Sequence, residues 1–250
     1  MARLTWWGHS TTLIEVDGVR LVTDPLLRPR VGPLRQPDWW EPHLGPLAAV
    51  LVSHAHLDHL DLPSLRRLPT GVPVIAPPGA AARTASRCRG GSVRALAAGR
   101  SLRLGPVTVT ATPASHPGGR YGRAVGPGAV GYWVQGSRTV YFAGDTALFA
   151  GMTDLAGADL AVLPTGGWGL SHGSGHMDAD EAAEAARRLR PRVAVPVHWG
   201  TLRIPVLWRA RTEATLGAGE RFRARAARVA PDVDVRVLPV GGSVTLPDDR

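Results

Sequence analysis

Histidine and aspartate residues gather in one short stretch of this 250-residue chain. Residues 54–59 read His-Ala-His-Leu-Asp-His, so four side chains that can bind a metal lie within six positions. Imidazole nitrogens and carboxylate oxygens suit zinc and comparable divalent ions. Burying so many ionisable groups without partners would cost several kcal/mol each. The stretch therefore predicts a divalent-metal site, and its lack of thiolates favours a catalytic site over a structural one.

Three further metal-competent residues occur singly, each shortly after a segment that reads as a strand. They are His116, Asp145 and His198. Open sheets place their functional sites at the ends of strands, so we expect these side chains to meet the 54–59 stretch. Seven such residues can hold two metal ions if one carboxylate bridges the ions. The pattern therefore predicts a site for two ions, built from several strand ends.

The segments that must position these residues alternate between strand-like and helix-like patterns. Apolar runs such as 48–52 are typical of strands covered on both faces, and Asp178 with Glu181 has the form of a helical capping box. Strands with helices on both sides predict a layered α/β domain, and no linker divides residues 1–250. The expected strands are 3–7, 11–16, 19–23, 48–52, 72–76, 92–96, a pair over 102–112, 129–134, 138–142, 159–163, 193–197, 233–238 and 243–246, and the expected helices are 61–68, 79–88, 178–189 and about 206–228.

The composition excludes several classes of protein. With 44% hydrophobic residues, the chain is too apolar to be disordered. No apolar run approaches the roughly 18 residues of a membrane span. The segment after Met1 has no signal-peptide core, so we expect a soluble, cytoplasmic protein. One cysteine, Cys88, cannot close an internal disulfide.

The net charge of +9 raises the question of an anionic partner. All 29 basic residues are arginines, and they are dispersed along the chain apart from a dense run at 221–228. Such a run is typical of a charged helix face. We therefore expect no specific recognition of nucleic acid, and we leave open whether the chain forms a homo-oligomer.

The 54–59 stretch resembles the HxHxDH motif of the metallo-β-lactamase superfamily, and His116, Asp145 and His198 occur in the superfamily's order. This resemblance spans essentially the whole chain and implies one domain over 1–250 with a four-layer αβ/βα sandwich fold. Within the superfamily, the chain most resembles the branch of the bacterial ascorbate-6-phosphate lactonases and the N-acyl-phosphatidylethanolamine phospholipase D group. The finer match is carried by residues 7–10, 23–25, 58–61, 141–146, 176–182 and 198–201.

The resemblance also implies a ligand set and a mechanism. Two divalent ions, zinc or manganese, would be bridged by Asp145. A water between the ions would be the nucleophile, and Asp58 could additionally orient it. The implied ligands are His54, His56 and His116 for one ion and Asp58, His59 and His198 for the other.

Four other polar residues are candidates for supporting roles. His9 and Asp24 resemble positions that fix ligand tautomers or line the site, although a loop histidine and a turn aspartate explain them equally well. His176 precedes the capping box at a helix entrance, where it can donate to a substrate oxygen or protonate a leaving group, or can simply face solvent. The glycine-rich setting of His172 suggests a closing lid over 165–175.

We therefore expect a binuclear metal-dependent hydrolase whose substrate is a small or amphipathic ester, lactone or phosphodiester. The 165–175 segment is longer than the lactonase pattern, so the resemblance does not fix the substrate. One alternative is a phosphodiesterase or nuclease that binds phosphate through Arg120, Arg123 or the 221–228 run. Another is a non-catalytic binding protein that retains metal in its site.

Overall fold

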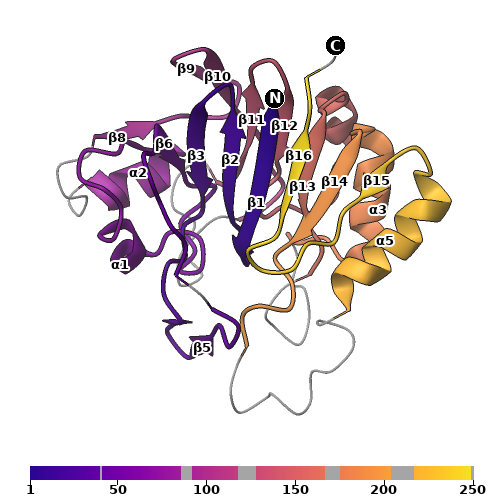
Figure 1. Ribbon diagram of the computed structural model, residues 1–250, viewed down its shortest axis with the longest axis horizontal. Coiled ribbons are helices and arrows are strands. Elements are labelled where there is room, and N and C mark those ends of the chain that lie inside the picture. The colour runs from indigo at the N-terminus through magenta and orange to yellow at the C-terminus, as the bar shows by residue number, and fades with distance from the viewer. Residues whose placement is uncertain (40, 86–91, 118–127, 167–174, 204–216, 249–250) are drawn as a thin grey trace.

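Two seven-stranded β-sheets pack face to face, and helices cover the outer side of each sheet (Figure 1). This arrangement confirms the predicted layered α/β sandwich. The computed structural model describes residues 1–39, 41–85, 92–117, 128–166, 175–203 and 217–248.

The first sheet joins antiparallel strands to a run of parallel ones. Antiparallel pairing links the strands from one edge as far as the fourth, and parallel pairing links the fourth to the far edge. A separate small sheet pairs β4 (Arg30–Val31) with β5 (Leu34–Arg35). In spatial order the strands of the first sheet are β16 (Ser243–Leu246), β1 (Ala2–Gly8), β2 (Thr11–Val16), β3 (Val19–Thr23), β6 (Ala49–Leu51), β7 (Val74–Ala76) and β8 (Val93–Ala95).

The second sheet has the same mixture of pairings. Three parallel pairings hold together the strands nearest one edge, and antiparallel hairpins form the rest. In spatial order its strands are β15 (Asp234–Val235), β14 (Val193–Val197), β13 (Leu160–Pro164), β12 (Thr139–Phe142), β11 (Val130–Gln135), β10 (Val107–Pro113) and β9 (Ser101–Leu104).

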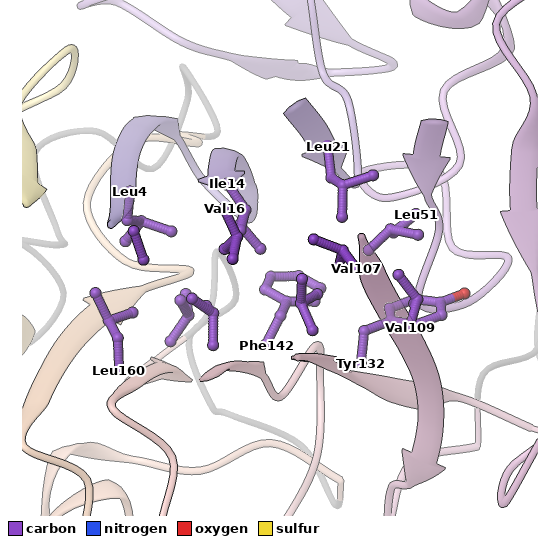
Figure 2. Packing of buried hydrophobic residues seen from close by; sticks show 14 of the residues in the cluster. Leu4, Ile14, Val16, Leu21, Leu51, Val107, Val109, Tyr132, Phe142 and Leu160 are labelled. Atoms are coloured by element: carbon purple, nitrogen blue, oxygen red, sulfur yellow. The ribbon is translucent and has the colours of Figure 1, made fainter. Parts of the chain in front are cut away.

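Side-chain alternation along the strands separates an inner core from two outer ones. Leu51 lies in the cluster between the sheets, whereas its neighbour Val50 packs among residues of the helices outside the first sheet. In the second sheet, Leu160 faces the inner cluster and Ala161 faces the outer helices. Figure 2 shows the inner cluster, where apolar side chains from both sheets meet. Burying each such large side chain contributes about 1.5–3 kcal/mol, so the ends of strands in the two sheets keep fixed relative positions.

Four α-helices are described. The helices α1 (Leu62–Leu65) and α2 (Pro78–Ala85) pack outside the first sheet, and α3 (Ala179–Leu189) and α5 (Ala218–Val229) pack outside the second. The helix α3 begins with the predicted capping box, because Asp178 accepts from the backbone of Glu181 while the Glu181 side chain accepts from that of Asp178. Within the described ranges, no helix has the length and apolar character that a membrane crossing requires.

Several predicted boundaries were wrong. The expected helix at 61–68 is helical only over α1, because the Arg67 and Leu68 amides donate to residues three positions back rather than four. The expected strand at 233–238 shrinks to β15, because Pro196 of the neighbouring β14 has no N–H to continue the ladder. A short 3₁₀ helix, η1 (Ala150–Leu155), was not predicted. The expected start of the last helix near 206 lies outside the described residues, as does the expected end of the second at 88.

Candidate metal centre

The predicted metal ligands meet where strands of both sheets end. The 54–59 stretch follows β6 of the first sheet, and His116, Asp145 and His198 follow β10, β12 and β14 of the second. Six of these seven side chains are buried, and His56 is partly exposed. The sandwich therefore assembles residues that are up to 144 positions apart in the sequence.

One group of potential ligands consists of His54, His56, His116 and Asp145. Their ligand atoms all lie within 4.8 Å of one another. Nε2 of His116 is 3.2 Å from Nδ1 of His56, and the rings of His54 and His116 stand edge to face with centroids 4.6 Å apart. Three imidazoles and one carboxylate thus converge on a space of the size that a metal ion takes.

A second group consists of Asp58, His59 and His198, together with His9 at the end of β1. The ligand atoms of these four residues also lie within 4.8 Å of one another. Oδ2 of Asp58 is 3.5 Å from Nε2 of His59 and 3.7 Å from Nε2 of His198. The structure therefore brings together the three residues that the resemblance implies for the second ion, with His9 beside them.

Asp145 contacts both groups. Its Oδ2 atom is 3.7 Å from Nε2 of His54 in the first group. The same oxygen is 3.0 Å from Nε2 of His59 and 3.3 Å from Nε2 of His198 in the second. A carboxylate that joins two metal ions must reach the ligands of both, and Asp145 does so.

Four buried polar atoms of the centre make no hydrogen bond within the described residues. Nε2 of His54, of His59 and of His198, and Oδ1 of Asp145, make no hydrogen bond to any residue that the structure describes. Each unsatisfied buried atom costs about 1–3 kcal/mol. Imidazole nitrogens and carboxylate oxygens without thiolates are ligands for zinc, and carboxylates also suit manganese. The residues present therefore fit bound divalent ions, which would satisfy these atoms.

A buried carboxylate supports one histidine from each group. Asp24 lies just after β3 with a φ of 35°, and its Oδ2 atom accepts from Nδ1 of His59 at 2.8 Å. The same oxygen accepts from the Ser53 hydroxyl at 2.6 Å. Because that hydroxyl hydrogen is used, Ser53 Oγ can only accept from Nδ1 of His54, 2.9 Å away. Both rings thereby turn their Nε2 atoms toward the centre. Asp24 was predicted to play such a role; Ser53 was not.

Two backbone carbonyls hold two further histidines. Nδ1 of His116 donates to the carbonyl of Gly175 at 2.8 Å, and Nδ1 of His198 donates to the carbonyl of Gly166 at 2.9 Å. These bonds fix the tautomers that leave Nε2 free to bind metal. Sequence reasoning missed both contacts, because every residue type carries the same carbonyl group.

His9 is fixed by its backbone. Its φ of 49° is left-handed, its N–H donates to Thr201 Oγ1, and its carbonyl accepts from both Trp6 Nε1 and the His198 amide. The side chain is buried, and Nε2 lies 2.9 Å from Oδ2 of Asp58. His9 therefore lies beside Asp58, one of the proposed ligands.

The two groups differ in charge. Burial lowers the pKa of His54 well below its usual value and lowers the pKa of His116 to about 4. Burial acts in the same direction on His59 and His198, but nearby carboxylates, above all Asp145, outweigh it. They raise the pKa of His198 to about 9 and that of His59 well above its usual value. Without metal, these first-group histidines are neutral, whereas the two second-group histidines hold protons that a metal must displace.

His176 lies at the partly exposed side of the cluster, just before α3. Its side chain is 19% exposed, and its Nε2 atom is 3.2 Å from Oδ2 of Asp145. With Asp145 and His198 it forms a third set of ligand atoms within 4.8 Å. His172, Arg120 and Arg123 lie outside the described residues. Most of the lid expected over 165–175 does so as well.

Comparisons with known proteins agree with this architecture. Residues 19–199 match the family model of the beta-lactamase superfamily domain. A UPF0173 metal-dependent hydrolase of Deinococcus radiodurans is 34% identical over 260 residues, which cover 98% of this chain and 100% of that protein. An uncharacterized protein of Mycobacterium tuberculosis is 33% identical over 238 residues, and the match covers 87% of this chain but 64% of that relative's length.

A solved structure shares the fold. Igni18, described as a novel metallo hydrolase from the hyperthermophilic archaeon Ignicoccus hospitalis, superposes with a TM-score of 0.76 at 27% sequence identity. The superposition covers 98% of each chain. The likeness therefore extends over both sheets and both layers of helices.

Proposed function

We propose that the chain, which belongs to the beta-lactamase superfamily, is a metal-dependent hydrolase that works with two divalent ions. The observation that carries this proposal is the position of Asp145, whose Oδ2 atom lies within 3.7 Å of Nε2 atoms from both histidine groups. Relatives named as metal-dependent hydrolases support the same reaction class. We further propose that residues 1–250 act as one domain.

The two groups of residues suggest how the ions would be held. Bound ions would supply a nucleophile by lowering the pKa of a water molecule, and would polarise the bond under attack. Asp145 would be shared by the two ions. The proposed ligands are His54, His56 and His116 for the first ion and Asp58, His59 and His198 for the second.

The remaining polar residues orient the reacting groups. Nε2 of His9 donates to Oδ2 of Asp58 and so fixes the carboxylate that would orient the attacking water. His176 is the partly exposed histidine beside Asp145, so its imidazole can donate a hydrogen bond or a proton to a substrate oxygen. Asp24 holds the ring of His59 and acts through it.

For the substrate we propose a small or amphipathic ester, lactone or phosphodiester. The motifs that resemble the lactonase and phospholipase D branch motivate this choice, notably 7–10 and 176–182. Each of these bonds has an electrophilic centre and an oxygen leaving group, which suit attack by an activated water and protonation by an imidazole.

A panel of esters, lactones and phosphodiesters, assayed with metal-loaded protein, tests the proposal. We expect turnover of at least one class, its loss after chelation, and its recovery when zinc or manganese is restored. DNA and RNA belong in the same panel, because turnover confined to them would identify a nuclease instead. Two bound ions with no turnover of any class would favour a metal-retaining binding protein.

A further inference from the structure

A pocket lies between the C-terminal ends of α3 and α5, away from the metal centre. Its volume is about 400 Å³, which is in the range of small-molecule sites. It is bounded by the two loops that lead from these helices into the adjacent parallel strands β14 and β15. The apolar part of its wall is formed by Ala186, Pro191, Val229, Ala230, Pro231 and Val233.

The polar rim of this pocket contains three arginines. Arg187 is paired with Glu184 at 2.6 Å, and Arg192 lies 3.6 Å from Asp159. Arg190, by contrast, makes no side-chain hydrogen bond or ion pair with any described residue. Its guanidinium therefore keeps its five donors for solvent or for a ligand.

The backbone at Arg190 is unusual for an arginine. It caps α3 in the left-handed region, with φ 47° and ψ 49°, and its N–H donates to the Ala186 carbonyl. Glycine usually takes this position because it has no Cβ to strain. Strained residues gather at functional sites, so an arginine in this conformation points to a role for its side chain.

Prolines and backbone hydrogen bonds restrict the two loops that wall the pocket. One loop reads Arg190-Pro191-Arg192 and the other Ala230-Pro231-Asp232, so a proline fixes φ at the centre of each. Each loop is also tied to the sheet, since the Val193 amide donates to Asp159 and the Asp234 amide to Arg192. A preformed site spends little binding energy on ordering itself.

We propose that this pocket binds an organic carboxylate that carries a compact apolar body. The guanidinium of Arg190 would pair with the carboxylate, which matches its planar donors, and the apolar wall would take the body. The 11 residues of α3 separate the pocket from His176 by about 16 Å of helix, so the proposal does not depend on the hydrolase function.

Calorimetric titration of the metal-loaded protein with 1-naphthoate tests this site. We expect saturable binding with a Kd of about 1 mM or tighter, and at least about tenfold weaker binding of the uncharged analogue 1-naphthamide. Arg190→Gly should weaken naphthoate binding by about tenfold or more without lowering the Tm, because glycine suits the left-handed backbone. Arg228→Ala, which removes an exposed arginine of α5 outside the pocket, should change nothing.

Two results would overturn the proposal. One is the absence of saturable binding to the parent protein. The other is equal affinity in the parent and in folded Arg190→Gly, which would place the naphthoate elsewhere, for example at the metal ions. Neither result affects the turnover measured in the substrate panel. The two experiments therefore test the carboxylate site and the proposed hydrolase function independently.

Discussion

Oδ2 of Asp24 lies 2.8 Å from Nδ1 of His59, and both side chains are completely buried. The same oxygen accepts from Ser53, whose own oxygen accepts from His54. One carboxylate thus supports a histidine of each proposed metal group. Because such outer carboxylates set the ring orientation and basicity of metal-binding histidines, Asp24 would affect both proposed ions without touching either.

Asp24→Asn should therefore weaken metal binding by about 10–100-fold, because the amide replaces one accepting oxygen with a donor. Competition against a chromophoric chelator measures this change. Asp154→Asn, an exposed position on η1, is the matched control and should bind as the parent does. Parental affinity in a folded Asp24→Asn variant would mean that the two histidines need no such support.

Asp145→Ala should lower the metal content from about two ions per chain and abolish turnover, because it removes the carboxylate that reaches both groups. Elemental analysis of the purified variant gives the stoichiometry, and Asp154→Ala serves as its control. If Asp145→Ala keeps both ions and normal activity, Asp145 does not bridge them.

Gly175→Ala tests the carbonyl that holds His116. A Cβ at Gly175 would lie 2.9 Å from Nδ1 of His116, and the φ of 107° is one that alanine rarely adopts. The loop must shift, so we expect one of the two ions to bind more weakly. A zinc titration should then show two separate affinities, whereas the parent should bind both ions tightly. Gly157→Ala is a control with a similar φ of 96° but with no atom within 4 Å of its Cβ. Identical titrations for the two variants would assign the effect to strain alone.

The spacing of 54–59 and the apolar runs before the single ligands were enough to predict which side chains would meet. This worked because a strand fixes where its last residue lies, and β6, β10, β12 and β14 all end at the same edge of the sandwich. His9 and Asp24 were singled out by the resemblance to the lactonase and phospholipase D branch, and each follows a strand of the first sheet.

The contacts that set the histidine tautomers could not be predicted. Serine is common on protein surfaces, so the residue type of Ser53 does not mark it as a contact of His54. The carbonyls of Gly166 and Gly175 belong to loops whose positions no local sequence pattern predicts. The left-handed backbone at Arg190 has no sequence signal either, because glycine and asparagine are the residues that mark this conformation. Tertiary packing decides these features.

Metal binding should release protons, and its affinity should rise with pH. In the metal-free chain His59 and His198 have raised pKa values, with that of His198 at about 9, so both rings are protonated near neutrality. An ion must displace these protons, so its apparent affinity should increase as the pH rises toward about 9, the pKa of His198. Calorimetry in buffers of different ionisation enthalpy counts the released protons. Binding that is independent of pH between 6.5 and 9 would contradict the proposed ligand role of His198.

His176→Ala tests whether His176 binds a metal ion or donates a proton to the substrate. Its Nε2 atom is 3.2 Å from Oδ2 of Asp145, yet the side chain is 19% exposed, as a group that meets substrate must be. We expect the variant to keep both ions and to lose about ten- to a thousand-fold in kcat/KM, which is the usual effect of removing a positioned proton donor.

Metal content and kinetics must be measured on the same preparation, because the two readouts separate the roles. His43→Ala removes an exposed histidine outside the cluster and should behave as the parent does. Loss of an ion from His176→Ala would show that His176 binds or supports that ion, and that it does not act on the substrate alone. If metal content and kinetics are both unchanged, His176 lies beside the site but takes no part in metal binding or turnover.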